Sequence, residues 1–342
     1  MAYTTINKYT DYFNNKLYTG NGGTQSITGV GFQPDFTWIK SRTSTKDHMV
    51  FDAVRGVQKS IRTNQTLAED TSTEYLTAFG TDGFTLGGNG KVNGGSTNYA
   101  SWNWKANGQG SSNTDGSINT TYTSVNATAG FSIITYTGTG SAGTIGHGLG
   151  VVPDFWMVKA RSETRAWYGW SKGMSYGDVV NWSSNGAKST DTSLFTSNAP
   201  TNQVINLGSS VGVNNSGQTF VCYAFSSKTG YSKFGSYTGN GNADGTFVYT
   251  GFKPSFVIIK NSSNAHNWTM IDNKRLGYND KNYILFPDLS NVEPTTSETD
   301  ILSNGFKIRA SANGVNQSGN TMIYMAFGQS LVGSNNVPCN AR

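Results

Sequence analysis

The chain has 342 residues, of which 35% are hydrophobic, 13% aromatic and 13% charged. The apolar and charged shares are low for a globular protein, but the aromatic content and a formal net charge of only +5 argue against disorder. The basic residues are scattered rather than gathered in a stripe, so no nucleic-acid binding is expected. The sequence has neither a signal-peptide core nor a run of about 18 apolar residues, so no membrane insertion is expected.

Short strands separated by turns are expected along the whole chain. An N-terminal arm is assigned to residues 1–16. The strand expected at 36–40 has aromatic and aliphatic side chains on both faces, which indicates a central strand. One or two helical turns are expected within residues 66–79, although a clean helical period is missing there. Asn-Gly and Asp-Gly pairs such as Asp82-Gly83 favour hairpin turns. This pattern predicts an all-β protein.

Three landmarks recur in the same order, which indicates an internal repeat. The first is Tyr-Thr-Gly followed by a glycine-rich turn, at Tyr18-Thr19-Gly20, Tyr136-Thr137-Gly138 and Tyr237-Thr238-Gly239. The second is a Pro-led aromatic strand that ends in Lys, at Pro34 to Lys40, Pro153 to Lys159 and Pro254 to Lys260. The third is a Val-Asn turn before an aromatic strand, at Val92-Asn93, Val213-Asn214 and Val315-Asn316.

The spacing of the landmarks sets the expected domain organisation. The prolines are 119 and 101 residues apart, and the Val-Asn turns are 121 and 102 residues apart. A unit of about 100 residues is the size of one β-sandwich domain. The sequence therefore predicts three tandem β-sandwich, jelly-roll-like modules. They are assigned to residues 17–106 (module 1), 118–226 (module 2) and 227–330 (module 3), with a flexible glycine- and serine-rich linker at 107–117 and a C-terminal tail at 331–342.

No catalytic or metal-binding residue is predicted. Asp35 and Asp154 occupy matching positions, but the third copy has Ser255, and no recurrent pair of carboxylates suggests glycoside hydrolysis. The three histidines, His48, His147 and His266, lie in turns or before strands with no cysteine or second histidine nearby, and His48 and His266 could be equivalent. Cys222 is expected to be a buried free thiol and Cys339 a thiol of the tail. No cofactor is expected.

Clusters of aromatic residues are the candidate contact sites. Aromatic rings stack on sugars and fill interface pockets, although strand alternation would bury at least half of them. The candidates for contact with a glycan or a partner are Trp102, Trp104, Trp167, Tyr168, Trp170 and Trp182.

Several strings resemble an uncharacterised repeat family of tailed phages, especially marine ones. They are Leu17 to Gly22, Gly29 to Phe36, Asp52 to Gly56, Asp82 to Gly87 and Tyr231 to Gly241. The resemblance spans nearly the whole chain from about residue 15 and implies a virion structural protein, made in the host cytoplasm, with no catalytic residues. At Met49 to Asp52 of module 1, module 2 departs from the pattern with Trp167 to Trp170.

The leading expectation is a tail fibre or receptor-binding component that contacts other virion proteins and host cell-surface glycans. A capsid decoration protein (cement or head fibre) is the alternative, and a polysaccharide-degrading tail enzyme is the third. A homo-oligomer, by analogy a homotrimer, is expected.

Overall fold

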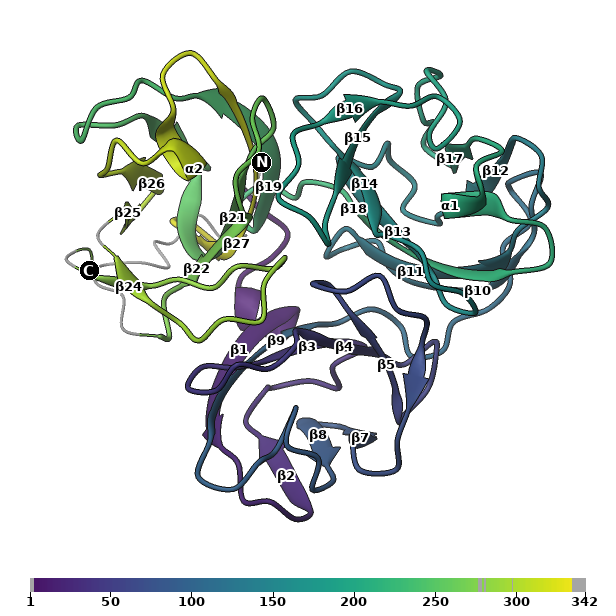
Figure 1. Ribbon diagram of the computed structural model, residues 1–342, viewed down its shortest axis with the longest axis horizontal. Coiled ribbons are helices and arrows are strands. Elements are labelled where there is room, and N and C mark those ends of the chain that lie inside the picture. The colour runs from purple at the N-terminus through teal and green to yellow at the C-terminus, as the bar shows by residue number, and fades with distance from the viewer. Residues whose placement is uncertain (1–2, 276–278, 280, 297, 334–342) are drawn as a thin grey trace.

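The computed structural model describes residues 3–275, 279, 281–296 and 298–333, and it confirms the all-β prediction. The chain forms three lobes around a common centre (Figure 1). The first lobe follows a 3-10 turn at Tyr9–Asp11. Its strands are β1 (Phe13–Thr19), β2 (Gln25–Thr28), β3 (Phe36–Ser41), β4 (Met49–Asp52), β5 (Lys59–Arg62), β6 (Asp70–Thr71), β7 (Leu76–Gly80), β8 (Gly83–Leu86) and β9 (Asn98–Trp104).

The second and third lobes repeat these elements. The second contains β10 (Thr120–Asn126), β11 (Phe131–Thr137), β12 (Gly143–Gly146), β13 (Phe155–Ala160), β14 (Tyr168–Ser171), β15 (Asp178–Asn181), β16 (Ser189–Thr190), β17 (Val204–Leu207), α1 (Val211–Asn214) and β18 (Thr219–Phe225). The third contains β19 (Ser232–Thr238), β20 (Phe247–Tyr249), β21 (Phe252–Asn261), β22 (Thr269–Asp272), β23 (Asn282–Tyr283), β24 (Thr295–Thr296), β25 (Thr299–Leu302), β26 (Gly305–Ile308), α2 (Asn313–Asn316) and β27 (Thr321–Ser330).

Strand pairing follows one order in all three lobes. The large sheets run β1-β9-β3-β4-β5-β6, β10-β11-β18-β13-β14-β15-β16 and β19-β27-β21-β22. Each lobe also has a small antiparallel sheet, β2-β8-β7, β12-β17 or β20-β26-β25. Module 2 differs in two respects. Strand β10 pairs with β11 and covers the sheet edge at which β1 and β19 are the terminal strands in the other modules, and the small sheet of module 2 has two strands instead of three. The exact module limits stay predictions, but the arm assigned to residues 1–16 already enters β1 at Phe13.

The central strands of each large sheet are buried on both faces. All six residues of β3 are buried, as predicted for a central strand. Phe36 and Trp38 contribute to a hydrophobic core shared by the three lobes, whereas Ile39 belongs to a separate core beneath the small sheet of module 1. Strand alternation explains this division, since successive side chains point to opposite faces.

Three aromatic rings meet at the centre of the molecule. Trp104, Phe225 and Phe327 occupy the same position in the β9, β18 and β27 strands, opposite Phe36, Phe155 and Phe256. Their ring centroids are separated by 6.5 Å (Trp104–Phe225), 5.5 Å (Trp104–Phe327) and 5.8 Å (Phe225–Phe327). Each lobe thus contributes one ring to a pseudo-threefold hub, and the three modules share part of their core.

The first and third landmarks of the repeat form one clamp in each lobe. The hydroxyls of Tyr18, Tyr136 and Tyr237 donate to the carbonyl oxygens of Val92, Val213 and Val315. The side-chain oxygens of Asn93, Asn214 and Asn316 accept from backbone amides of the glycine-rich turn. Its glycines Gly22, Gly140 and Gly241 have φ values of 75°, 77° and 71°, a conformation that disfavours other residues. The repeated sequence therefore specifies a repeated structure.

Two of the three seams between lobes carry matching ion-pair networks. At the seam between modules 1 and 2, Arg55 contacts Asp52 and Glu69, and Arg161 of module 2 contacts Glu69 at 3.0 Å. The hydroxyl of Tyr223 donates to Asp52. Burial alone would raise the pKa of the Glu69 carboxyl, but the charges of Arg55 and Arg161 outweigh this effect and lower the pKa. The network joins the two lobes through groups that are largely withdrawn from water.

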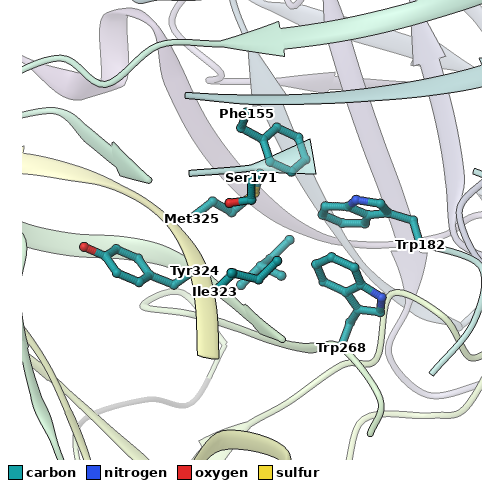
Figure 2. Close-up of a pocket in the computed structure, with 8 residues that line it drawn as sticks. Phe155, Ser171, Trp182, Trp268, Ile323, Tyr324 and Met325 are labelled. Carbon is teal, nitrogen blue, oxygen red and sulfur yellow. The ribbon is translucent and has the colours of Figure 1, made fainter. Parts of the chain in front are cut away.

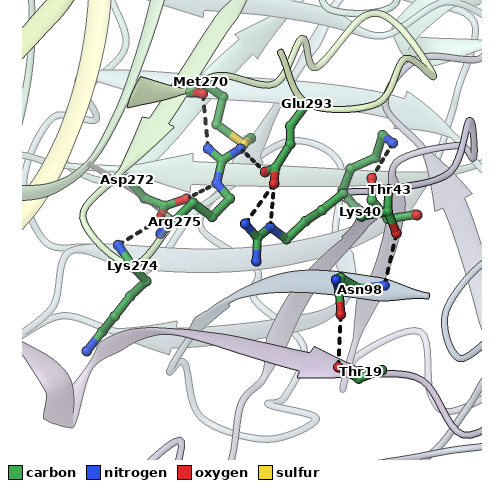
Figure 3. Close-up of polar contacts among 11 residues, drawn as sticks. Thr19, Lys40, Thr43, Asn98, Met270, Asp272, Lys274, Arg275 and Glu293 are labelled. Carbon is green, nitrogen blue, oxygen red and sulfur yellow. Dashed lines mark hydrogen bonds and ion pairs between the residues drawn. The ribbon is translucent and has the colours of Figure 1, made fainter. Parts of the chain in front are cut away.

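The seam between modules 3 and 1 repeats this arrangement residue by residue (Figure 3). Arg275 contacts Asp272 at 2.6 Å and Glu293 at 3.4 Å, and Arg42 of module 1 contacts Glu293 at 2.7 Å. The indole of Trp102 donates to Asp272, as Tyr223 does to Asp52. The backbone amides of Glu293 and Glu69 donate to the carbonyls of Arg42 and Arg161.

The seam between modules 2 and 3 lacks the Asp, Arg and Glu residues of this network. Ser171 and Met174 stand where module 1 has Asp52 and Arg55. The amide of Lys188 donates to the carbonyl of Ser262, so Lys188 takes the place of the Glu and Ser262 that of the Arg, and Lys188 pairs with Asp178 of its own module. A small apolar cavity lies here, lined among others by Ser171, Trp182, Trp268 and Met325 (Figure 2). Trp182 stacks on Trp268 with a centroid distance of 4.0 Å. This seam relies on aromatic contact instead.

The N-terminal segment closes the ring of lobes without a covalent link. The amide of Tyr9 donates to the side chain of Gln329, which in turn donates to the carbonyl of Asn7. Tyr3 donates from its hydroxyl to the carbonyl of Gly251. The first residues of the chain are thereby held on module 3.

Two local expectations were wrong. The linker at 107–117 is not a free spacer: the Asn107 amide donates to Ser124, and Ser111 exchanges backbone hydrogen bonds with Thr123. Residues 66–79 contain strands β6 and β7 and no helix, and the short helices lie instead at the Val-Asn turns of modules 2 and 3. Both errors have one cause, since hydrogen bonds to neighbouring segments override local composition.

One buried carboxyl gives a testable pH dependence. Burial raises the pKa of Asp288 to about 6, against the opposing effect of its hydrogen bonds and of Lys260. Asp288 accepts from the Trp268 amide, as Asn64 accepts from that of His48. A raised carboxyl pKa favours folding at acid pH, and this contribution is lost as the pH rises through about 6.

We expect Asp288→Asn, which installs the residue of module 1, to stabilise the fold above pH 6 by up to about 3 kcal/mol, the value of a pKa raised by about two units. The variant should also lose part of the pH dependence of stability between pH 4 and 6. Urea unfolding at pH 4.5 and 7.5 measures both. The reciprocal Asn64→Asp is the matched control and should destabilise at pH 7.5; equal pH profiles for wild type and Asp288→Asn would refute the assignment.

Candidate functional site

A groove along the edge strand of module 3 is the candidate binding site. Two adjoining hollows, of about 450 and 350 Å³, share Lys172, Lys233, Phe234 and Tyr249 in their linings. Strand β19 forms the floor, strand β20 forms one wall, and Lys172 reaches in from module 2. The groove therefore lies beside the seam between modules 2 and 3, where the ion pairs are missing.

Exposed aromatic rings form one wall of the groove. Phe247 and Tyr249 are 43% and 55% exposed, although they flank the buried Val248. Alternation along β20 places both rings on the outer face, about 6.6 Å apart along the strand. Tyr3 adds a third ring that is 38% exposed, and its hydroxyl bonds to Gly251 beside Tyr249. Such rings offer flat apolar faces with hydroxyl groups at their rims.

Two lysines supply the charge of the groove. The ammonium of Lys233 donates to the carbonyl of Tyr249 at 2.7 Å and lies 5.4 Å from the centre of the Tyr249 ring. Lys172 pairs with Asp154 at 2.9 Å, and its side chain is 59% exposed. Burial, followed by the charge of Lys172, lowers the pKa of Lys233. The two cations thus act on each other, and each ammonium retains donors for a ligand.

The other two lobes lack this set of residues. In strand register, Phe247 and Tyr249 correspond to Ser26 and Thr28 in module 1 and to Thr144 and Gly146 in module 2. Lys172 corresponds to Ala53, because the backbone amides of these two residues donate to the backbone carbonyls of Asp154 and Asp35, which directly precede β13 and β3. Lys233 corresponds to Asn14 and Ser132. The groove is therefore a divergence of one copy, at positions where the other copies have mostly small or polar residues.

Five of the six predicted contact residues are not on the surface. Trp102, Trp104, Trp167, Trp170 and Trp182 are at most 5% exposed. Trp104 belongs to the hub, Trp102 and Trp182 lie at seams, and the indole of Trp167 donates to the Arg62 carbonyl of module 1. Trp170 stacks on Trp156 at 4.5 Å. All five are structural residues. Trp102, Trp104, Trp167 and Trp182 are buried because neighbouring lobes cover the sheet face opposite each small sheet, whereas Trp170 matches Phe51 in strand register and faces the core of its own module.

The sixth candidate, Tyr168, is half-buried and packs against α1, close to Gly212. The strand register explains why this segment was misaligned. Tyr168 pairs with Val158 as Met49 pairs with Ile39, so Tyr168 to Ser171 match Met49 to Asp52. Trp167 and Trp268 then match His48, and the suggested equivalence of His48 with His266 is wrong.

The polar residues considered for catalysis have structural partners. Asp35 accepts from the amide of Ala106, and Asp154 from that of Ser227, as turn residues would. His48 accepts from the Trp38 indole, and burial lowers its pKa well below the ordinary value. Cys222 is buried and free, as predicted, and burial raises its pKa, while Cys339 lies outside the described residues. None of these groups lines the groove.

The described part of the chain shows two further features. It holds no group of three or more His, Cys, Asp or Glu side chains that could bind a metal ion. No helix within it has the length and apolar character needed to cross a membrane.

Comparison with known proteins gives one match. The family described as Domain of unknown function (DUF7483) matches residues 8–330 in a single span that includes all three lobes. No curated protein and no solved structure matches the chain.

Proposed function

The chain belongs to the DUF7483 family, and we propose that it is a non-enzymatic virion structural protein that binds host cell-surface glycans through the groove of module 3. The resemblance to the tailed-phage repeat family supports the virion assignment. The groove supports the binding assignment, since exposed aromatic rings beside polar donors are a typical glycan-binding surface. The single observation that carries the proposal is the presence of Phe247, Tyr249 and Lys233 in this copy alone.

The groove favours binding over hydrolysis. Glycoside hydrolysis commonly requires two carboxyl groups that flank the scissile bond. The described residues that line the two hollows include no Asp or Glu, and the nearby Asp154 is engaged by Lys172 and Ser227. A polysaccharide-degrading enzyme is therefore the weakest of the three candidates.

A capsid decoration protein remains the second candidate because of the shape of the chain. The described residues form three lobes joined at one hub, and no elongated shaft extends from them (Figure 1). A homotrimer is proposed by analogy with other assemblies, and the three lobes of one chain already form a threefold arrangement. Electron microscopy of native particles would separate tail from capsid density.

The glycan-binding function is tested by a glycan array probed with the full chain. We expect wild type to bind a subset of bacterial surface glycans and to leave them intact on mass spectrometry. The variant Tyr249→Thr, which installs the residue of module 1, should lose at least tenfold in affinity. Absence of binding to every arrayed glycan, or release of cleavage products, would contradict the proposal.

The virion assignment has a separate test. Particles purified from cells that carry the gene in its native phage genome should contain the chain as a stoichiometric component by mass spectrometry. Absence of the chain from such particles would contradict this part of the proposal, whatever the outcome of the array.

A further inference from the structure

We infer that the groove of module 3 selects acidic saccharides, with Lys172 and Lys233 binding the carboxylate and the rings of Tyr249 and Phe247 contacting the sugar. This inference rests on the proposed glycan-binding function and names the ligand class. It follows from three features of the groove: its charge, the free donors of the two lysines, and their position relative to the rings.

The charge of the groove is unbalanced. Among the described residues of its lining, Lys172 and Lys233 carry charge and none is acidic, and Asp154, which pairs with Lys172, lies outside the lining. Because Asp154 also accepts from the Ser227 amide, it is fixed to the module boundary rather than directed into the groove. Bringing an anion between the two ammonium groups relieves their mutual repulsion, which an uncharged sugar cannot do.

The lysines have donors that the protein leaves unused. An ammonium group carries three N–H donors. The described contacts of Lys233 use one donor at the Tyr249 carbonyl, and those of Lys172 use one at Asp154. Charge-assisted hydrogen bonds to a carboxylate are shorter and about twice as strong as neutral ones. The remaining donors can therefore hold the two oxygens of one carboxylate.

The rings lie where the rest of the sugar would extend. Lys233 sits over the Tyr249 ring, so an anion bound to Lys233 lies next to an aromatic face. The outer-face position of Phe247 extends the apolar wall along β20. A pyranose that carries a carboxylate has both an apolar ring face and a charge, and it fits both halves of the groove.

Isothermal titration calorimetry with trigalacturonic acid and its fully methylated ester tests the inference. The two probes have the same sugar rings and differ in charge. We expect the acid to bind at least tenfold more tightly than the ester. Raising the salt concentration from 50 to 500 mM should weaken binding of the acid and leave binding of the ester nearly unchanged. Equal affinity for both probes would overturn the charge selection and leave glycan binding intact.

Variants drawn from the other copies test which residues are responsible. Lys172→Ala and Lys233→Asn install the residues of module 1, whose backbone has the same pairing, so folding should be retained. We expect each to reduce binding of the acid fivefold or more and to reduce binding of the ester by a clearly smaller factor, whereas Tyr249→Thr should weaken the binding of both probes by similar factors. Lys16→Ala in module 1 is the control and should change neither. Full acid binding by Lys172→Ala/Lys233→Asn would refute the assignment.

A second outcome separates this inference from the proposed function. If neither galacturonate probe binds but neutral glycans bind on the array and lose binding in Tyr249→Thr, the acidic class is wrong and the glycan function stands. If no glycan of either kind binds, both fail.

Discussion

Arg55→Met is expected to destabilise the protein by about 3–5 kcal/mol, because it leaves a buried carboxylate without its partner. The side chains of Arg55 and Asp52 are fully buried, and Tyr223 supplies the only other side-chain contact to Asp52 among the described residues. Glu69 loses one of its two arginine partners at the same time. Urea unfolding monitored by tryptophan fluorescence, at neutral pH, measures the loss.

The protein contains its own control for this experiment. Module 2 has Ser171 and Met174 at the positions of Asp52 and Arg55. The double variant Asp52→Ser/Arg55→Met removes both charges, so we expect it to recover most of the stability lost in Arg55→Met. A single variant within about 1 kcal/mol of wild type, or a double variant no better than the single one, would show that the buried charges are not balanced in this way.

Phe327→Ala is expected to cost about 3–5 kcal/mol and to uncouple the lobes. Phe327 is 1% exposed and contacts Trp104 and Phe225 of the other two modules. Truncation leaves a cavity that all three lobes line, so the loss is shared rather than local. Differential scanning calorimetry should show one transition for wild type and a broadened or split transition for the variant.

Phe84→Ala is the matched control for the hub. Phe84 is also buried, but it belongs to the core beneath the small sheet of module 1. Hydrogen exchange should show loss of protection confined to module 1 in this variant and spread over the three lobes in Phe327→Ala. The same local pattern in both variants would contradict a shared hub.

The repeat landmarks were predictable because they carry the backbone contacts of each lobe. The hydrogen bonds from Tyr to Val and from the turn to Asn recur at the landmark positions of all three lobes. The regular spacing of the landmarks in the sequence therefore reflects the contacts that these residues make in each lobe. The Lys that ends the second landmark was predicted only as a strand residue. In the structure Lys40, Lys159 and Lys260 are buried, and burial lowers the pKa of each to about 8.

The contact residues were not predictable from composition. Strand alternation allows one face of a sheet to be exposed, and the tryptophans were therefore considered as surface contacts. Burial of the second face by other lobes depends on tertiary arrangement, which Trp104 and Trp167 do not reveal locally. A residue-by-residue comparison of the three copies would have found Phe247 and Tyr249, but it required the strand pairings of β2, β12 and β20, which the local sequence does not show.

Closure of the ring by Tyr9 and Gln329 has a consequence for the order of the modules along the chain. Because every lobe contacts both of the others, the covalent links contribute connectivity but do not determine which surfaces meet. A rearranged chain in which module 2 comes first and module 1 follows module 3 is therefore expected to form the same three seams. Gene rearrangements that shift the starting module are thus compatible with this architecture.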